Sequence, residues 1–152
     1  MAGRTGKPLG RHLAFWDTSA LVPLCVRQSI TPRVVSLYKS YEAVVWWATP
    51  LEIASALARL VRMKYLDPTD WARSRRLAEN LADAWSVIQP SDALRANASR
   101  LLDRYDLRAA DALQLSAALE WCDDAPAGKV FLANDEKLQE AAVLSGFDAS
   151  RI

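Results

Sequence analysis

The chain has 152 residues, of which 51% are hydrophobic and 24% are charged, so we expect one globular domain whose core needs no disulfide or metal. The 19 Lys and Arg residues nearly balance the 18 Asp and Glu residues, which excludes a histone-like polycation. The single histidine excludes multi-histidine zinc sites and argues against Ser-His-Asp and Cys-His catalysis. No apolar run reaches the roughly 18 residues of a membrane span. Cys25 and Cys122 are too few for a disulfide framework, and they indicate a cytoplasmic protein with two buried thiols.

Short apolar runs alternate with helical patterns along the chain. Residues 1–12 are predicted to form a flexible tail, and residues 13–152 a single domain. The expected elements, in chain order, are strand 13–16, helices 20–25 and 33–41, strand 43–47, helices 50–64 and 71–84, strand 85–88, helices 92–105 and 107–121, strand 130–132, helix 136–144 and an edge strand at 147–148. This alternation predicts an α/β fold in which helices cover both faces of a parallel sheet. A mostly helical bundle is the alternative, but short runs rich in Val, Phe and Trp favour strands.

Two of the predicted helices begin at residues that commonly cap helices. Thr49 is expected to cap the helix at 50–64, with Pro50 at its first position and Glu52 completing a capping box. Asp106 is expected to cap the helix at 107–121. These residues therefore predict where the two helices start.

Four acidic residues stand at the ends of predicted elements. Asp17 and Asp135 each follow a predicted strand, and Glu52 lies in the first turn of the helix after the second strand. Because ligands bind at the carboxyl ends of parallel strands, these three carboxylates should converge at one edge of the sheet. Asp111 lies in an apolar helical segment, where an acid is unlike an ordinary solvent-exposed surface residue. The four together predict a single acidic site.

The chemistry of such a site favours divalent cations. Gathered carboxylates repel one another unless a cation neutralises them or their pKa values rise. Their oxygen ligands suit Mg²⁺ or Mn²⁺, and the natural reaction is metal-assisted hydrolysis of a phosphodiester by an activated water. Taken singly, each acid has a simpler explanation: Asp17 as a helix cap, Glu52 in a capping box, Asp135 at a helix dipole, and Asp111 paired with Arg108.

The segments around these acids form an ordered set of four motifs. They read FWDTSAL at 15–21, TPLEIASAL at 49–57, LRAADALQL at 107–115 and FLANDEKL at 131–138. In order and spacing they resemble the PIN-domain ribonucleases, in particular VapC-type toxins of toxin–antitoxin pairs, and the third motif is the most specific. The resemblance implies a three-layer α/β/α fold with a parallel sheet of about five strands, a Mg²⁺ or Mn²⁺ site and cleavage of RNA. It also implies a homodimer and a cognate VapB-like antitoxin that blocks the active site.

The resemblance assigns roles to individual residues. The four acids would bind metal and act in catalysis, with Asp135 as a second-metal or outer ligand. Ser19 would orient Asp17 or the substrate, and Thr18 would lie beside them. The motifs also differ from the family pattern at two positions.

The last motif has Ala133 where the family has Thr, and Asn134 is the neighbouring residue that could supply the missing polar contact. In the third motif, Gln114 replaces a common His. We expect the second replacement to affect packing or substrate contacts more than catalysis. All four acids are present, so we expect an active enzyme.

RNA that approaches an acidic pocket requires basic residues at its rim. Arg59 and Arg62 lie on the helix of the second acid, and Arg75 and Arg76 lie on the next helix. These four are candidates for contacts with phosphates, with an ordinary solvated helix face as the alternative for each.

The tryptophans have two possible roles, core packing and partner binding. Trp46 and Trp47 should face opposite sides of their strand, both under helices. Trp71 is a candidate for an interface with a partner, with core packing as the alternative.

Two other functional classes fit the sequence less well. A non-catalytic PIN-like module that only binds RNA or protein would not need all four acids. A phosphotransfer enzyme with Asp17 as nucleophile is the other class, but haloacid-dehalogenase phosphatases have a second Asp where this chain has Ser19.

Overall fold

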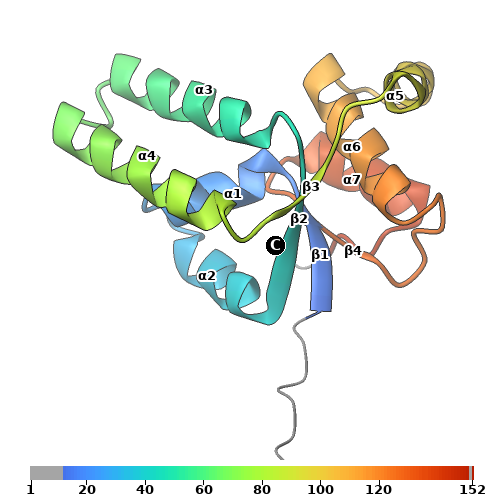
Figure 1. Ribbon diagram of the computed structural model, residues 1–152, viewed down its shortest axis with the longest axis horizontal. Coiled ribbons are helices and arrows are strands. Elements are labelled where there is room, and N and C mark those ends of the chain that lie inside the picture. Colours follow the sequence, from blue (N-terminus) through green and yellow to red (C-terminus); the bar gives the residue numbers. More distant parts are fainter. Residues whose placement is uncertain (1–11, 151) are drawn as a thin grey trace, which may run out of the picture.

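Four parallel strands form the central sheet in the computed structural model, which describes residues 12–150 and 152 (Figure 1). The elements in chain order are β1 (His12–Trp16), α1 (Thr18–Cys25), α2 (Thr31–Ser40), β2 (Tyr41–Trp46), α3 (Thr49–Arg62), α4 (Pro68–Ala82), β3 (Ser86–Ile88), α5 (Asp92–Arg104), α6 (Ala109–Trp121), β4 (Val130–Leu132) and α7 (Glu136–Ser145). The strand order is β3-β2-β1-β4. This architecture confirms the predicted α/β fold and excludes the helical bundle.

The pairing around β1 aligns the carboxyl ends of the strands. Phe15 pairs with Val44 of β2 on one side and with Phe131 of β4 on the other, both in parallel register. The backbone N–H of Asp17 then donates to the carbonyl of Leu132 at 2.9 Å, which ties the end of β1 to the end of β4. The connections that leave β1, β2 and β4 therefore start at the same edge of the sheet.

Side chains of each central strand alternate between two separate cores. On one face, residues of β1, β2 and β4 pack against α1, α2 and α3; these are Ala14, Trp16, Ala43, Val45, Val130 and Leu132. On the other face, Phe15, Val44, Trp46 and Phe131 pack against α5, α6 and α7. Helices thus cover both faces in three layers, and the strands read as continuous apolar runs because both of their faces are buried (Figure 1).

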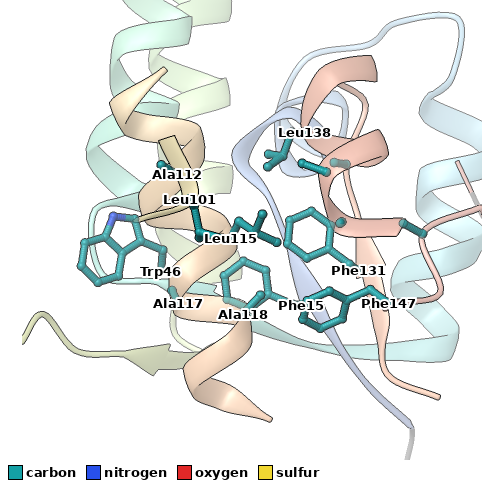
Figure 2. Packing of buried hydrophobic residues seen from close by; sticks show 14 of the residues in the cluster. Phe15, Trp46, Leu101, Ala112, Leu115, Ala117, Ala118, Phe131, Leu138 and Phe147 are labelled. Atoms are coloured by element: carbon teal, nitrogen blue, oxygen red, sulfur yellow. The ribbon is translucent and has the colours of Figure 1, made fainter. Parts of the chain in front are cut away.

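Aromatic rings fill the core beneath α6 and α7. The ring centroids of Phe15 and Phe131 are 5.4 Å apart, and those of Phe131 and Phe147 are 5.5 Å apart (Figure 2). Leu115 and Leu138 pack into the same cluster from the two helices. This packing fixes α6, which carries Asp111, and α7, which Asp135 caps, on one side of the sheet.

The predicted count of about five strands is too high by one. The segment at 147–148 forms an isolated parallel bridge, Val130 to Asp148, and not a full strand. It follows Gly146, which ends α7 with a left-handed φ of 108°. The extended segment after this turn is too short to form more than one bridge.

Two further predictions about the chain are corrected. His12, which we assigned to the tail, is the first residue of β1 and pairs with Tyr41; the rest of the predicted tail, residues 1–11, lies outside the described residues. Trp47 follows the end of β2 and is 55% exposed, so it does not lie under a helix, whereas Trp46 is buried as expected. Trp71 is partly buried and packs against the core beneath α1 and α3.

Both cysteines are free and buried, as their number and apolar surroundings predicted. Among the described residues, no helix combines the length and the hydropathy that crossing a bilayer would require.

Candidate functional site

All four predicted acids line one cavity of about 340 Å³, which we call the acid pocket. Its lining consists of Asp17, Thr18, Ser19, Val22, Gln28, Glu52, Ser55, Ala56, Arg59, Asp111 and Asp135. These residues come from α1 and the residue before it, the α1–α2 loop, α3, α6 and the residue before α7. Elements far apart in the sequence therefore bring the acids together at the carboxyl edge of the sheet.

Asp17 is the most buried of the four acids, with 5% of its surface exposed. Its Oδ2 accepts hydrogen bonds from the backbone N–H and the hydroxyl of Ser19, at 2.9 Å and 2.5 Å. Burial raises the pKa of Asp17 from 3.8 to about 6, although the hydrogen bonds from Ser19 oppose this rise. The carboxylates of Glu52 and Asp111 add to the rise by repulsion. Asp17 is thus both the cap of α1 and a member of the pocket.

Ser19 links the ends of two strands. Its Oγ donates to Asp17 and accepts a hydrogen bond of 2.8 Å from the backbone N–H of Asn134. The polar contact that we expected from the side chain of Asn134 therefore comes from its backbone. Ala133 is buried in the core beneath α6 and α7, where a Thr hydroxyl would need its own partner.

Glu52 is held by two donors. Its Oε2 accepts from the hydroxyl of Thr18 at 2.8 Å and from Nε2 of Gln114 at 2.6 Å. Burial raises the pKa of the Glu52 carboxyl, whereas these two hydrogen bonds lower it. The predicted capping box is wrong: Ala48 is the cap residue, Thr49 is already helical and fully buried, and its hydroxyl lies 3.3 Å from Gln114 Nε2.

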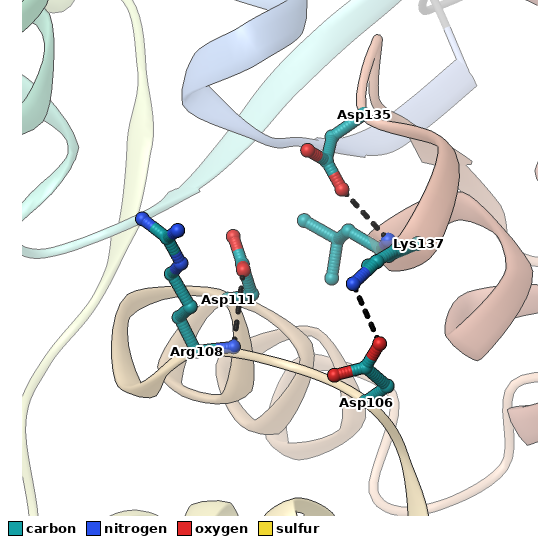
Figure 3. A network of polar contacts seen from close by, with 6 residues as sticks. Asp106, Arg108, Asp111, Asp135 and Lys137 are labelled. Carbon is teal, nitrogen blue, oxygen red and sulfur yellow. Dashed lines mark hydrogen bonds and ion pairs between the residues drawn. The ribbon is translucent and has the colours of Figure 1, made fainter.

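Asp111 lies in the first turn of α6 and accepts a hydrogen bond of 3.3 Å from the backbone N–H of Arg108 (Figure 3). Burial raises the pKa of Asp111, with a further rise from the charge of Asp135 and a counteracting fall from Arg108. Asp106 does not cap α6, contrary to the prediction. It pairs with Lys137 at 2.5 Å, across the gap between α6 and α7.

Asp135 enters the acid pocket from the start of α7. Its Oδ1 accepts from the backbone N–H of Leu138 at 2.9 Å, so it also caps that helix (Figure 3). Asp135 is exposed, in contrast to Asp17. Asp17 therefore caps α1, as its simpler explanation held, and Asp135, which was expected to favour a helix dipole, caps α7; both acids also line the acid pocket.

The donor set of the acid pocket suits a hard divalent cation. Each of the four carboxylates engages one oxygen with protein donors, and within the described residues no protein donor is bonded to the other oxygen. Besides burial, repulsion between the carboxylates contributes to their pKa shifts: Glu52 and Asp111 raise the pKa of Asp17, and Asp111 raises that of Glu52. A bound cation would relieve that repulsion. In residues 12–150 and 152, however, no three acidic, histidine or cysteine side chains form a preassembled metal-binding group.

The predicted arginines separate into two groups. Arg59 lines the acid pocket, about two helical turns beyond Glu52 on α3, whereas the other three arginines are absent from that lining. Arg75 pairs with Glu79 at 3.6 Å and lies over the ring of Trp71, with its guanidinium carbon 5.5 Å from the ring centroid. Arg76 lines a separate hollow on α4.

Sequence reasoning missed the part that Gln114 plays in the arrangement of the acids, and it expected Arg108 to pair with Asp111 through its side chain, whereas the hydrogen bond comes from its backbone N–H. Gln114 is buried and donates to Glu52. Its position three residues after Asp111 places both on one helix face, and an amide within an apolar helix was the available signal. The backbone of Arg108 holds Asp111, and its guanidinium extends beside that carboxylate (Figure 3).

Comparisons with known proteins agree with this fold. The family model described as PIN domain matches residues 14–144. PAE2754 from Pyrobaculum aerophilum is 19% identical, with a TM-score of 0.62 and coverage of 87% of each chain. FitAcB from Neisseria gonorrhoeae is 16% identical, with a TM-score of 0.60 and coverage of 90% of this chain and 97% of that chain. A toxin–antitoxin complex from Klebsiella pneumoniae is 15% identical, with a TM-score of 0.57 and coverage of 82% and 88%. No curated protein matches the sequence.

Proposed function

This chain belongs to the PIN domain family, and from that premise we propose that it is a metal-dependent endoribonuclease, the toxin of a toxin–antitoxin pair. The observation that carries the proposal is the acid pocket. Four carboxylates line it, and each keeps one oxygen that no donor in the described residues engages. Nuclease chemistry at a phosphodiester is the reaction for which such an oxygen-rich pocket is suited.

The four acids differ in burial, and we assign their roles in metal binding accordingly. Asp17, Glu52 and Asp111 would hold Mg²⁺ or Mn²⁺, and the more exposed Asp135 would complete the set from α7. A bound ion would supply positive charge to the phosphate oxygens and lower the pKa of a water. The hydrogen bonds from Ser19 to Oδ2 fix the orientation of the Asp17 carboxylate, and they therefore also fix the position of Oδ1.

The substrate must bring its negative phosphates to an acidic pocket. Arg59 lies in the pocket lining and is placed to contact a phosphate there. Arg62, Arg75 and Arg76 are absent from that lining, so the proposed phosphate contact is assigned to Arg59 alone. Thr18 is committed to Glu52 through its only hydroxyl hydrogen, so its role is to orient that carboxylate.

The biological setting is part of the same proposal. The chain shares its fold with the toxin–antitoxin complex from Klebsiella pneumoniae, which supports a cognate antitoxin, of the VapB-like kind, as a partner. We propose in addition that the protein acts as a homodimer in the cytoplasm. RNA is the proposed substrate.

The test is cleavage of total RNA by the purified, antitoxin-free protein with Mg²⁺ or Mn²⁺. Discrete fragments should appear, and they should vanish in EDTA and in the Asp17→Asn variant, which keeps the shape of the side chain and removes its charge. Asp103→Asn is the matched control, because Asp103 is an exposed carboxylate on α5 outside the pocket. If the folded protein binds RNA but cleaves none with either metal, the non-catalytic module replaces the nuclease.

A further inference from the structure

The amide of Gln114 joins the two helical layers at the acid pocket. Gln114 is 1% exposed and lies on α6, on one face of the sheet. Its Nε2 lies 2.6 Å from Glu52 Oε2, 3.2 Å from Thr18 Oγ1 and 3.3 Å from Thr49 Oγ1, and all three belong to helices on the other face. One side chain thus fixes where α1, α3 and α6 meet.

The hydrogens of this network can be assigned. Thr18 donates its single hydroxyl hydrogen to Glu52 Oε2 at 2.8 Å, so toward Gln114 it can only accept. The amide nitrogen has two hydrogens. The shortest distance assigns one of them to Glu52, and the two threonine hydroxyls share the other. Glu52 Oε2 therefore accepts two hydrogen bonds from neutral donors, which leaves Oε1 as the oxygen available to the pocket.

This arrangement has no simpler explanation in core packing. The other amide atom, Gln114 Oε1, is buried without a hydrogen-bond partner among the described residues. A side chain selected only for packing would not leave such an acceptor unsatisfied, because this costs roughly 1–3 kcal/mol. An apolar residue of the same length would avoid that cost.

We propose that Gln114 is a positioning residue, which holds Glu52 with Oε1 directed to the metal and to the substrate. Gln114 lies three residues after Asp111 on α6, so the same helix presents one acid and orients another. This inference rests on the proposed metal-dependent function. Gln114 touches no substrate in it and acts through Glu52.

The test compares three variants of the full chain. Q114M keeps the length of the side chain and removes both N–H donors, whereas Q114H keeps an N–H at a similar distance from the backbone. S116A is the matched control, because Ser116 lies on the same helix, is equally buried at 1% and loses one hydrogen bond, to the carbonyl of Leu94 at 2.8 Å, away from the acids. Binding of Mn²⁺ is measured by calorimetry, and unfolding is measured by thermal denaturation in EDTA.

Q114M should bind Mn²⁺ roughly 10- to 100-fold more weakly than the wild type, as is usual when a partner that orients a ligand is removed. Q114H should recover part of that loss, and S116A should bind Mn²⁺ as the wild type does although it also loses a buried hydrogen bond. Cleavage by Q114M should lose kcat with little change in KM, because the RNA contacts remain.

Any of three results would overturn the inference. If the wild type binds Mn²⁺ and Q114M binds it equally well, Gln114 does not position Glu52 and only this inference fails. If the wild type binds no Mn²⁺, the proposed function fails and the inference with it. If Q114M does not fold, Q114N provides the same comparison, because its amide is one methylene farther from Glu52. Binding of Mn²⁺ by Q114N with wild-type affinity would then overturn the inference.

Discussion

Replacing Asp17 with Asn should stabilise the folded protein while it abolishes cleavage. Asp17 is 5% exposed, and burial raises its pKa from 3.8 to about 6. That rise means that ionised Asp17 costs the folded state about 3 kcal/mol once both the folded and unfolded chains are ionised. Asn carries no charge and keeps the oxygen that accepts from Ser19. The figure is an upper limit, because a neutral amide accepts weaker hydrogen bonds than a carboxylate does.

The pH dependence of the effect follows from the direction of the pKa shift. The fold favours protonated Asp17, so this stabilisation is complete below pH 3.8 and is lost as the pH rises to about 6. At pH 8 and in EDTA, Asp17→Asn should therefore melt above the wild type by up to roughly 6–12 °C, at about 2–4 °C per kcal/mol for a domain of this size. At pH 4 the two proteins should melt nearly together.

Thermal denaturation followed by circular dichroism at both pH values, in EDTA, measures this difference. Asp103→Asn, which removes an exposed charge on α5, should change stability by no more than about 0.5 kcal/mol at either pH. The reasoning is refuted if Asp17→Asn melts at or below the wild-type temperature at pH 8. It is refuted equally if the gain is the same at pH 4 and pH 8, since a gain without pH dependence cannot come from the Asp17 charge.

Three further predictions follow from burial and from the lining of the acid pocket. Arg59→Glu should weaken RNA binding and reduce the slope of log affinity against log salt concentration by about 1, as measured by filter binding. Arg76→Glu, outside the pocket, should leave that slope nearly unchanged, and equal effects of the two variants would contradict the assignment. Leu57→Ala should lower the free energy of unfolding by roughly 2–5 kcal/mol in urea denaturation, because Leu57 is fully buried. Leu51→Ala should lower it by at most about 0.5 kcal/mol, because that residue is 71% exposed. A small loss at Leu57 would argue against the packing of α3. Trp71→Ala should lower the melting temperature without changing the mass in light scattering, because the ring packs against the core; a lower mass would place Trp71 at an interface instead.

The elements that the sequence predicted correctly have local signals. The central strands are short runs of large apolar residues, such as the run from Ala43 to Trp46, since both of their faces are buried. The acids were located because parallel strands end at one edge of the sheet, which makes positions such as Asp17 predictable from strand boundaries alone.

The features that the sequence predicted wrongly depend on contacts between segments distant in the chain. Thr49 looked like a helix cap, but Gln114, 65 residues away in sequence, draws it into a buried network. Asp106 looked like a cap, but Lys137 lies close enough to pair with it. At Thr49, a local capping preference of about 1 kcal/mol was outweighed by tertiary contacts. At Asp106, the helix begins later than predicted, with Arg108 as its cap residue.

What the sequence by itself determined is the set of layers, the edge of the sheet where a site forms and the four acids that line it, because periodicity and strand ends are local properties. What only the tertiary structure decided is how that site is supported. The amide of Gln114 reaches Glu52 across the sheet, and α3 places Arg59 in the lining of the acid pocket, whereas Arg75 and Arg76 of α4 lie outside it. These contacts depend on how helices from opposite faces of the sheet meet in space. The spacing of residues along the chain does not determine the distances between those helices.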